Sequence, residues 1–350
     1  MNDIANILKN IHHELIKPSY ITLQPQQDSF GVSKIVVNLP FAAKTHEAEI
    51  KQYINNYLLN HGITDKFDIE LNIAIIPHKI KPGLVRIKNI KNVIAVTSGK
   101  GGVGKSTVAI NLAVSLAQNG AKVGLLDADI YGPSVPILVG NRDFKPDVED
   151  KCFIPLEKYG IKILSFGFLI AETQPAIWRG AIVGKALDQM LFDTKWGELD
   201  YLVIDMPPGT GDIHLNMCQK MPITAVVTVT TPQDIALLDV IKSIEMYNKM
   251  SIPCLGIIEN MSSYLCPKCG HLEHIFGDKG GDKLSLDYDL NLLAKLPLNL
   301  DIRKCSDEGI PIAATDNQLA KLYLDLATQV TLKLSNLPKD YSSNIAKVSI

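Results

Sequence analysis

The stretch GKGGVGKST, residues 99–107, decides the fold of this chain. It fits the pattern G-x-x-x-x-G-K-[ST] of a phosphate-binding loop. A short apolar run rich in β-branched residues, 93–97, precedes it, and apolar residues at helical spacing follow from Val108 onward. The order of strand, glycine loop and helix predicts a phosphate loop at the carboxyl end of a buried strand.

The chemistry of the loop follows from its glycines and its last residues. Glycine lets successive backbone N–H groups point into one concavity at a helix N-terminus, and this concavity attracts a polyphosphate. Lys105 would reach the β- and γ-phosphates of ATP, and the Ser106 hydroxyl would bind Mg²⁺. The alternative is a glycine-rich turn without a ligand. The predicted nucleotide-binding residues of the loop are Gly99, Gly101, Gly102, Val103, Gly104, Lys105, Ser106 and Thr107.

Composition limits the class of protein. The chain has 350 residues, of which 46% are hydrophobic and 21% are charged, so it can build a large domain and a small one. A net charge of −2 gives no general basic surface, no apolar run approaches the ~18 residues that span a bilayer, and the first residues do not show a signal-peptide pattern. We therefore expect a cytoplasmic protein with neither nucleic acid nor membrane as partner. In that compartment the six cysteines indicate metal or redox chemistry, or burial, rather than disulfides.

Aspartates follow two further buried strands. Asp127 and Asp129 come after the strand 122–126, and Asp205 ends the strand 201–205. Open α/β sheets bind ligands at the carboxyl ends of their strands. We predict that Asp205 binds Mg²⁺ through a water molecule. Asp127 would contact the ligands of the metal rather than the metal itself. The alternative is that the aspartates only begin turns.

A pair of cysteines forms the second decisive stretch, Cys266-Pro267-Lys268-Cys269-Gly270. Two thiolates at this spacing can hold one metal centre, but they are half of a four-thiolate site. A symmetric dimer could bring two copies together and complete it. Three alternatives remain: a zinc site within one chain that also uses His271 and His274, a redox-active dithiol, and a purely structural turn.

Together these motifs resemble a known family. With Lys100 after its first glycine, GKGGVGKST resembles the deviant Walker A motif of the MinD/ParA/nitrogenase-iron-protein class of P-loop NTPases. D-x-P-P-G-T-G-D at 205–212 and C-x-x-C at 266–269 resemble the Mrp/ApbC iron–sulfur cluster carrier branch, over residues 92 to about 330. The resemblance implies an α/β fold with a mostly parallel sheet flanked by helices.

The resemblance also implies roles for individual residues. Lys100 would reach into the nucleotide of the partner in an ATP-bound homodimer, and Asp129 would orient the attacking water. With Lys105, these are the expected catalytic residues. Glu259-Asn260-Met261-Ser262 resembles a family segment in which Asn260 contacts adenine. Trp178-Arg179-Gly180 resembles a segment near the nucleotide-dependent interface.

The implied function is an ATPase that carries an iron–sulfur cluster. Cys266 and Cys269 would hold a [4Fe–4S] cluster between subunits, with zinc as a substitute in aerobic preparations. An iron–sulfur assembly scaffold would be the donor, and apo iron–sulfur proteins would be the acceptors. The alternative is a positioning ATPase of the MinD/ParA type, which needs a membrane or DNA surface but no cysteine pair.

The chain divides into three parts by pattern. Residues 1–88 predict a small α+β domain, similar to iron–sulfur assembly factors, which opens with a helix from Ile4 to Leu15. Residues 89–336 are the expected ATPase domain, and residues 337–350 are an expected loose tail.

Overall fold

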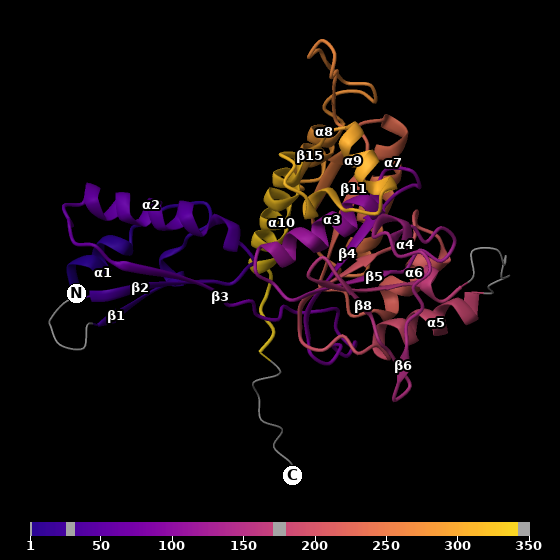
Figure 1. Cartoon of the computed structure of the whole chain (residues 1–350), viewed down its shortest axis with the longest axis horizontal. Helices are drawn as coiled ribbons and strands as arrows, with labels where there is room; N and C mark the ends of the chain where they lie inside the picture. The colour runs from indigo at the N-terminus through magenta and orange to yellow at the C-terminus, as the bar shows by residue number, and fades with distance from the viewer. Residues whose placement is uncertain (1, 26–31, 171–179, 342–350) are drawn as a thin grey trace.

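A computed structural model describes residues 2–25, 32–170 and 180–341 of the chain. Its largest feature is an eight-stranded sheet in the order β15-β12-β11-β4-β10-β5-β9-β8 (Figure 1). Neighbouring strands are parallel except β8, which runs antiparallel to β9. This confirms the predicted α/β fold with a mostly parallel sheet. The strands are β4 (Ile90–Ser98), β5 (Val123–Asp127), β8 (Leu156–Lys158), β9 (Ile161–Ser165), β10 (Leu199–Asp205), β11 (Ala225–Thr230), β12 (Cys254–Asn260) and β15 (Leu292–Leu296).

Helices cover both faces of this sheet because alternate strand residues point to opposite sides. On β4, Ile94 and Val96 belong to a core cluster that includes α3 (Lys105–Gln118) and α10 (Leu319–Ser335). Val93 and Ala95 face a second cluster on the other side. That side is covered by α5 (Gly180–Phe192), α6 (Asp212–Lys220) and part of α7 (Asp234–Lys249), while α7 also packs on α8 (Gly280–Asp287). Two short helices, α4 (Val135–Leu138) and α9 (Leu300–Asp307), and the hairpin β6 (Val148–Glu149) and β7 (Cys152–Phe153) lie in the connections.

The first part of the chain forms a separate three-stranded sheet with its own core. Its elements are α1 (Asn2–Leu8), β1 (Ile21–Pro25), β2 (Val32–Leu39), α2 (Glu47–Asn60) and β3 (Asp68–Ile73). The predicted opening helix is too long, since α1 ends at Leu8 and the chain leaves it through turn bonds such as Asn10 N to Ile7 O. Ile11 and Leu15 are nevertheless buried in this core. Their apolar spacing therefore reflects burial in the core and not a continuation of the helix.

This first unit lies beside α10 and the end of α3 (Figure 1). A short 3₁₀ turn, Lys44–His46, makes part of the contact. Lys44 N donates to Asn119 O at 3.0 Å, and His46 Nε2 lies 3.2 Å from the Thr328 hydroxyl. The small unit is therefore hydrogen-bonded to the helix that begins at the phosphate loop.

The start of the expected loose tail is held in place. Lys79 N donates to Pro338 O at 2.8 Å, and Arg86 pairs with Asp340 at 2.8 Å. These contacts tie residues 338–340 to the segment that joins the two sheets, which the sequence pattern alone did not indicate.

Candidate functional site

The phosphate loop connects the centre of the sheet to a helix. β4 ends at Ser98 and α3 begins at Lys105, as the motif predicts. Gly102 and Gly104 have φ of 80° and 83°, in the left-handed region that disfavours other residues. A Cβ on Gly104 would also lie 2.3 Å from the Asn260 amide nitrogen. Position 104 therefore requires glycine, because its backbone is left-handed and because a Cβ would clash with the Asn260 side chain.

Lys105 lies among carboxylates that end two neighbouring strands. Its Nζ is 2.5 Å from Asp205 Oδ1 and 3.9 Å from Asp129 Oδ2. The lysine is 6% exposed and Asp205 is fully buried, so this is an interior ion pair. Three residues that were predicted from separate motifs thus meet at one point.

Asp127, the last residue of β5, lies beside this group. Asp127 and Asp205 are register partners on β5 and β10. Asp127 accepts hydrogen bonds from the Ser165 hydroxyl at 2.8 Å and from Asp129 N at 3.1 Å. Burial, and next the Asp205 carboxylate, raise the pKa of Asp127 to about 7. Burial also raises the pKa of Asp205, against the opposing pull of Lys105.

The donor set suits Mg²⁺. Asp205 Oδ2 is buried and has no hydrogen-bond partner among the described residues. The Ser106 hydroxyl lies 3.4 Å from Lys105 Nζ, beside the same carboxylate. Carboxylate and hydroxyl oxygens are the ligands that Mg²⁺ prefers, and a buried oxygen without a partner is costly unless a cation or donor satisfies it. Ser106 and Asp205 are therefore the residues that would hold the metal.

Lys100 folds back onto its own chain. Its Nζ donates to Gln233 Oε1 at 3.1 Å, and Gln233 precedes α7. The role of Lys100 in a partner subunit stays a prediction. Gln233 was not among the predicted site residues, and the only signal for it was a polar side chain shortly after a buried parallel strand.

Asn260 contacts the loop itself. Its Nδ2 donates to Val103 O at 2.8 Å, and the residue is 8% exposed at the end of β12. In this arrangement the side chain braces the phosphate loop. The predicted contact with adenine stays a prediction.

The segment 205–212, which carries the D-x-P-P-G-T-G-D motif, contacts the same region. Gly209 N donates to Ser98 O at 2.9 Å, next to the phosphate loop. Behind it lies a buried histidine that sequence reasoning missed, His214. Since its Nδ1 lies 3.1 Å from Pro207 O, which can only accept, Nδ1 carries the proton and Nε2 accepts from the Tyr247 hydroxyl at 2.9 Å. Burial lowers the pKa of His214, which favours this neutral form.

The cysteine pair lies in a projecting hairpin. Strands β13 (Tyr264–Leu265) and β14 (Leu272–Glu273) pair antiparallel, and the cysteines occupy the turn between them. The backbone N–H groups of Cys269 and Lys268 hydrogen-bond to the Cys266 sulfur and lower its pKa. Cys269 is exposed. A turn that stabilises a thiolate in this way is suited to metal binding.

One chain does not complete a metal site in this hairpin. No group of three or more metal-ligating side chains occurs among the described residues. His271 Nε2 faces Glu273 at 3.3 Å, and His274 Nδ1 faces Ser262 O at 2.8 Å. The next helix along the chain, α8, begins only at Gly280, which disfavours a redox dithiol at a helix N-terminus. Within the described residues, the hairpin therefore offers the two cysteines without a third ligand beside them.

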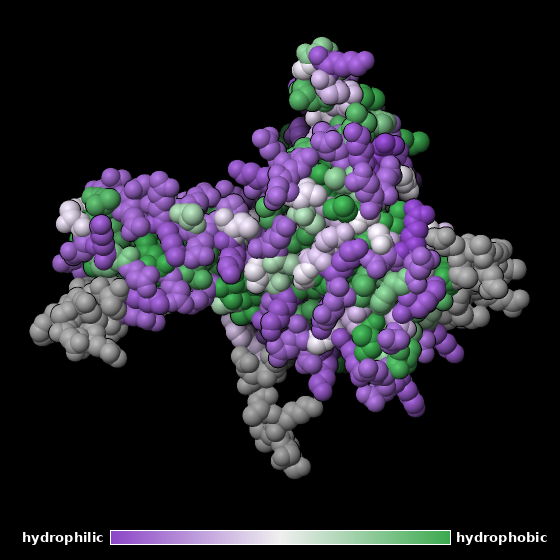
Figure 2. All heavy atoms as spheres, in the orientation of Figure 1, coloured by the Kyte–Doolittle hydropathy of each residue, from purple (hydrophilic) through white to green (hydrophobic). Residues whose placement is uncertain are grey.

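Exposed apolar side chains occur in the same hairpin region as the cysteines. Leu265, Leu272 and Ile275 are each more than half exposed, and Figure 2 shows hydrophobic atoms at the tip of the projection. Exposed apolar groups around a metal-binding turn are typical of a surface that becomes covered.

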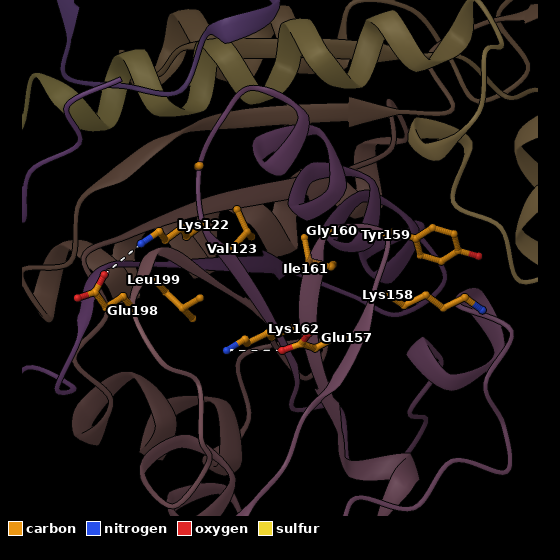
Figure 3. A pocket seen from close by; sticks show the side chains of 11 residues that line it. Lys122, Val123, Glu157, Lys158, Tyr159, Gly160, Ile161, Lys162, Glu198 and Leu199 are labelled. Atoms are coloured by element: carbon orange, nitrogen blue, oxygen red, sulfur yellow. Dashed lines mark hydrogen bonds and ion pairs between the residues drawn. The ribbon is translucent and has the colours of Figure 1, made fainter. Parts of the chain in front are cut away.

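A separate cavity lies at the opposite edge of the sheet. It has a volume of about 610 Å³ and is lined by residues at the amino ends of β5, β9 and β10 (Figure 3). Lys122 pairs there with Glu198 and Lys162 with Glu157. These two lysines are therefore already paired with carboxylates, and the cavity lies away from the phosphate loop.

Known proteins are similar to this chain over most of its length. The ParA family model described as NUBPL iron-transfer P-loop NTPase matches residues 89–331. The chain belongs to this family. It is 50% identical to the iron-sulfur cluster carrier protein of Pseudomonas fragi over 263 residues, 74% of this chain and 92% of that one. It is 43% identical to the protein of the same description from Haemophilus influenzae over 343 residues, 95% of this chain and 92% of that one.

Solved structures agree with the fold. A nucleotide-binding protein from Archaeoglobus fulgidus, in complex with ADP, is 40% identical with a TM-score of 0.58, covering 65% of this chain and 89% of that one. The cell division ATPase MinD of Pyrococcus furiosus is 22% identical with a TM-score of 0.52, covering 68% of this chain and 98% of that one. At this identity the likeness supports only the fold. As a NUBPL-family P-loop NTPase the chain is an ATPase.

The segment predicted near the nucleotide-dependent interface lies partly outside the described residues. Trp178 and Arg179 are not among them, so this prediction is not tested. Within the described residues no helix is long and apolar enough to span a bilayer.

Proposed function

We propose that this chain is an ATP-dependent iron–sulfur cluster carrier that binds a [4Fe–4S] cluster between two copies and transfers it to apo-proteins. The observation that carries the proposal is the exposed Cys266–Cys269 turn on a nucleotide-binding domain, without further ligands in the described part of its own chain. Two such turns supply the four thiolates that this cluster type uses. The names of the relatives support the same function. They favour it over a positioning ATPase, which has no need of a projecting thiolate pair.

The phosphate site would power the conformational cycle. Lys105 binds the phosphates and spreads their negative charge, while Asp129 holds the attacking water. Ser106 and Asp205 would hold Mg²⁺, which supplies charge neutralisation at the β- and γ-phosphates. Lys100 would leave Gln233 and reach the nucleotide of the partner subunit.

The cluster is cargo, so its binding has to be reversible. Cys269 and the apolar rim of the hairpin are exposed in one chain, which gives both a second copy and an acceptor protein access. We propose that an iron–sulfur assembly scaffold loads the site and that the protein acts in the cytoplasm. ATP binding and hydrolysis would change how firmly the two hairpins hold the cluster.

Anaerobic reconstitution tests the proposal. Purified full-length protein is incubated with iron and sulfide, and cluster formation is followed as broad absorption near ~400 nm. We expect Cys266→Ser and Cys269→Ser to lose this absorption. Cys152→Ser, a half-buried cysteine on β7, is the matched control and should keep it.

Transfer is then measured with an apo [4Fe–4S] enzyme whose activity returns when it receives a cluster. Reactivation by wild-type protein but not by Cys269→Ser supports a carrier. A wild-type protein that binds ATP yet remains colourless and pellets with lipid vesicles or DNA would instead indicate a positioning ATPase.

A further inference from the structure

The phosphate loop and the base of the cysteine hairpin are attached to the same two strand ends. Pro232 and Gln233 follow β11, and Glu259 and Asn260 end β12. From each strand end, one residue contacts the phosphate loop. Its chain neighbour contacts the start of α8, the helix that follows the hairpin.

The first bridge runs through β11. Gln233 Oε1 accepts from Lys100 Nζ at 3.1 Å. The preceding residue, Pro232, packs its backbone against Gly280 so closely that a Cβ there would lie 2.5 Å from Pro232 O. This glycine therefore permits a direct backbone contact, with no flexible side chain between the two segments.

The second bridge runs through β12. Asn260 Nδ2 donates to Val103 O at 2.8 Å. Glu259, only 2% exposed, accepts from Gly281 N at 2.5 Å at the N-terminus of α8. A buried carboxylate on helix N–H groups is a strong contact. A shift of either the loop or α8 must therefore move the same strand end.

We propose that Gln233 and Asn260 are positioning residues that transmit the nucleotide state of the phosphate loop to the cysteine hairpin, residues 264–276. The purpose of this coupling rests on the proposed function, whereas the contacts that carry it all lie within one chain. When Lys100 contacts a phosphate it gives up Gln233, and the loop that carries Pro232 is released from one side. Because packed interiors do not absorb such shifts, Gly280 and the hairpin base follow.

Hydrogen–deuterium exchange of the hairpin tests this without requiring a bound cluster. Full-length protein is saturated with Mg-ATP or Mg-ADP, nucleotide binding is confirmed for each variant, and exchange is read for peptides covering 264–276. We expect wild-type exchange to differ between the two nucleotides. Gln233→Ala should reduce that difference at least about fivefold, a loss comparable to the smaller coupling factors found between two binding sites.

Matched variants separate transmission from general packing. The Gln233 side chain does not cap α7, so alanine leaves the start of that helix intact. Gln233→Glu keeps an oxygen acceptor for Lys100 and should restore the difference. Gly280→Ala should change hairpin exchange because its Cβ meets Pro232, whereas Gly184→Ala on α5, with nothing within 4 Å, should not. Gln329→Ala on α10 is the control for loss of a glutamine amide.

The inference is overturned if wild-type hairpin exchange is the same with ATP and ADP, or if Gln233→Ala keeps the full difference. Iron and sulfide counted on separately reconstituted samples of the same protein report on the carrier. A nucleotide-dependent hairpin in a protein that never binds a cluster would refute the carrier and leave the bridges standing.

Discussion

Lys105 and Asp205 form an interior ion pair in which Nζ lies 2.5 Å from Oδ1, at the junction of the phosphate loop and β10. Lys105→Gln would remove the cation and leave the buried carboxylates of Asp205 and Asp129 without it. We expect ATP hydrolysis to fall at least about 100-fold, since the phosphate charge loses its main counter-ion. The free energy of unfolding at pH 8 should fall by about 3 kcal/mol, the cost of breaking a buried pair.

Phosphate release and urea denaturation followed by circular dichroism measure both effects. The control is Lys122→Gln, which breaks an exposed pair with Glu198 and should alter neither quantity appreciably. Full hydrolysis by Lys105→Gln would contradict the assignment of the loop.

The raised pKa of Asp127 predicts an unusual pH dependence of stability. Burial, followed by the Asp205 carboxylate, raises this pKa from 3.8 to about 7 in the folded chain. Between these values the folded protein binds a proton that the unfolded chain does not, so this group destabilises the fold as pH rises through the window. The full penalty is present above about pH 7.

Asp127→Asn should therefore gain stability relative to wild type as the pH is raised from about 5 to about 8. Each unit of pKa difference corresponds to about 1.4 kcal/mol. Urea midpoints of nucleotide-free protein across this range measure the effect. An identical pH profile in wild type and variant would show that Asp127 ionises normally.

The hairpin turn should make Cys266 the most reactive of three cysteines. Hydrogen bonds from the backbone of Cys269 and Lys268 lower the pKa of Cys266, whereas burial raises that of Cys254 to about 11 and that of Cys218 to about 12. Because the thiolate is the reactive form, iodoacetamide at pH 7.5 should label Cys266 first. Mass spectrometry of timed digests gives the order.

Lys268→Ala provides the control, since it removes the ammonium and keeps the backbone N–H. Its Cys266 should titrate as in wild type. If the midpoint of Cys266 alkylation instead rises to that of a free cysteine, the lysine charge and not the turn lowers the pKa.

Asn119 joins the two sheets at the end of the phosphate-loop helix. Its Nδ2 donates to the Thr328 hydroxyl at 3.0 Å, and its side-chain oxygen accepts from Thr45. Asn119→Ala should loosen the first unit, since it leaves buried groups unpaired, at a cost of about 1–3 kcal/mol. Faster proteolysis between residues 74 and 92 would reveal this. Unchanged proteolysis would mean that the units are held by other contacts.

The sequence predicted which residues of the phosphate loop lie together because such loops need particular residues at fixed spacing. Gly104, Lys105 and Asp205 lie together, as their motifs require. Contacts of residues that belong to no motif could not be predicted. Gln233 and His214 follow no spacing rule, and only the folded chain brings them to Lys100 and Pro207.

Element boundaries were harder to predict where burial and helix periodicity coincide. Ile11 and Leu15 continue the apolar spacing of α1 but lie beyond its end. Strand β1 was not predicted either, because five residues that end in proline carry little strand signal. Tertiary packing, rather than local preference, decides both cases.

The central claim is that two copies of the Cys266–Cys269 turn share one cluster. Its most direct test is to count iron and acid-labile sulfide per chain after anaerobic reconstitution, with the mass of the same complex measured by native mass spectrometry. We predict about two iron and about two sulfide per chain, carried by a dimer and lost in Cys269→Ser. A monomer that holds a single metal ion, or a dimer whose iron survives Cys269→Ser, would contradict it.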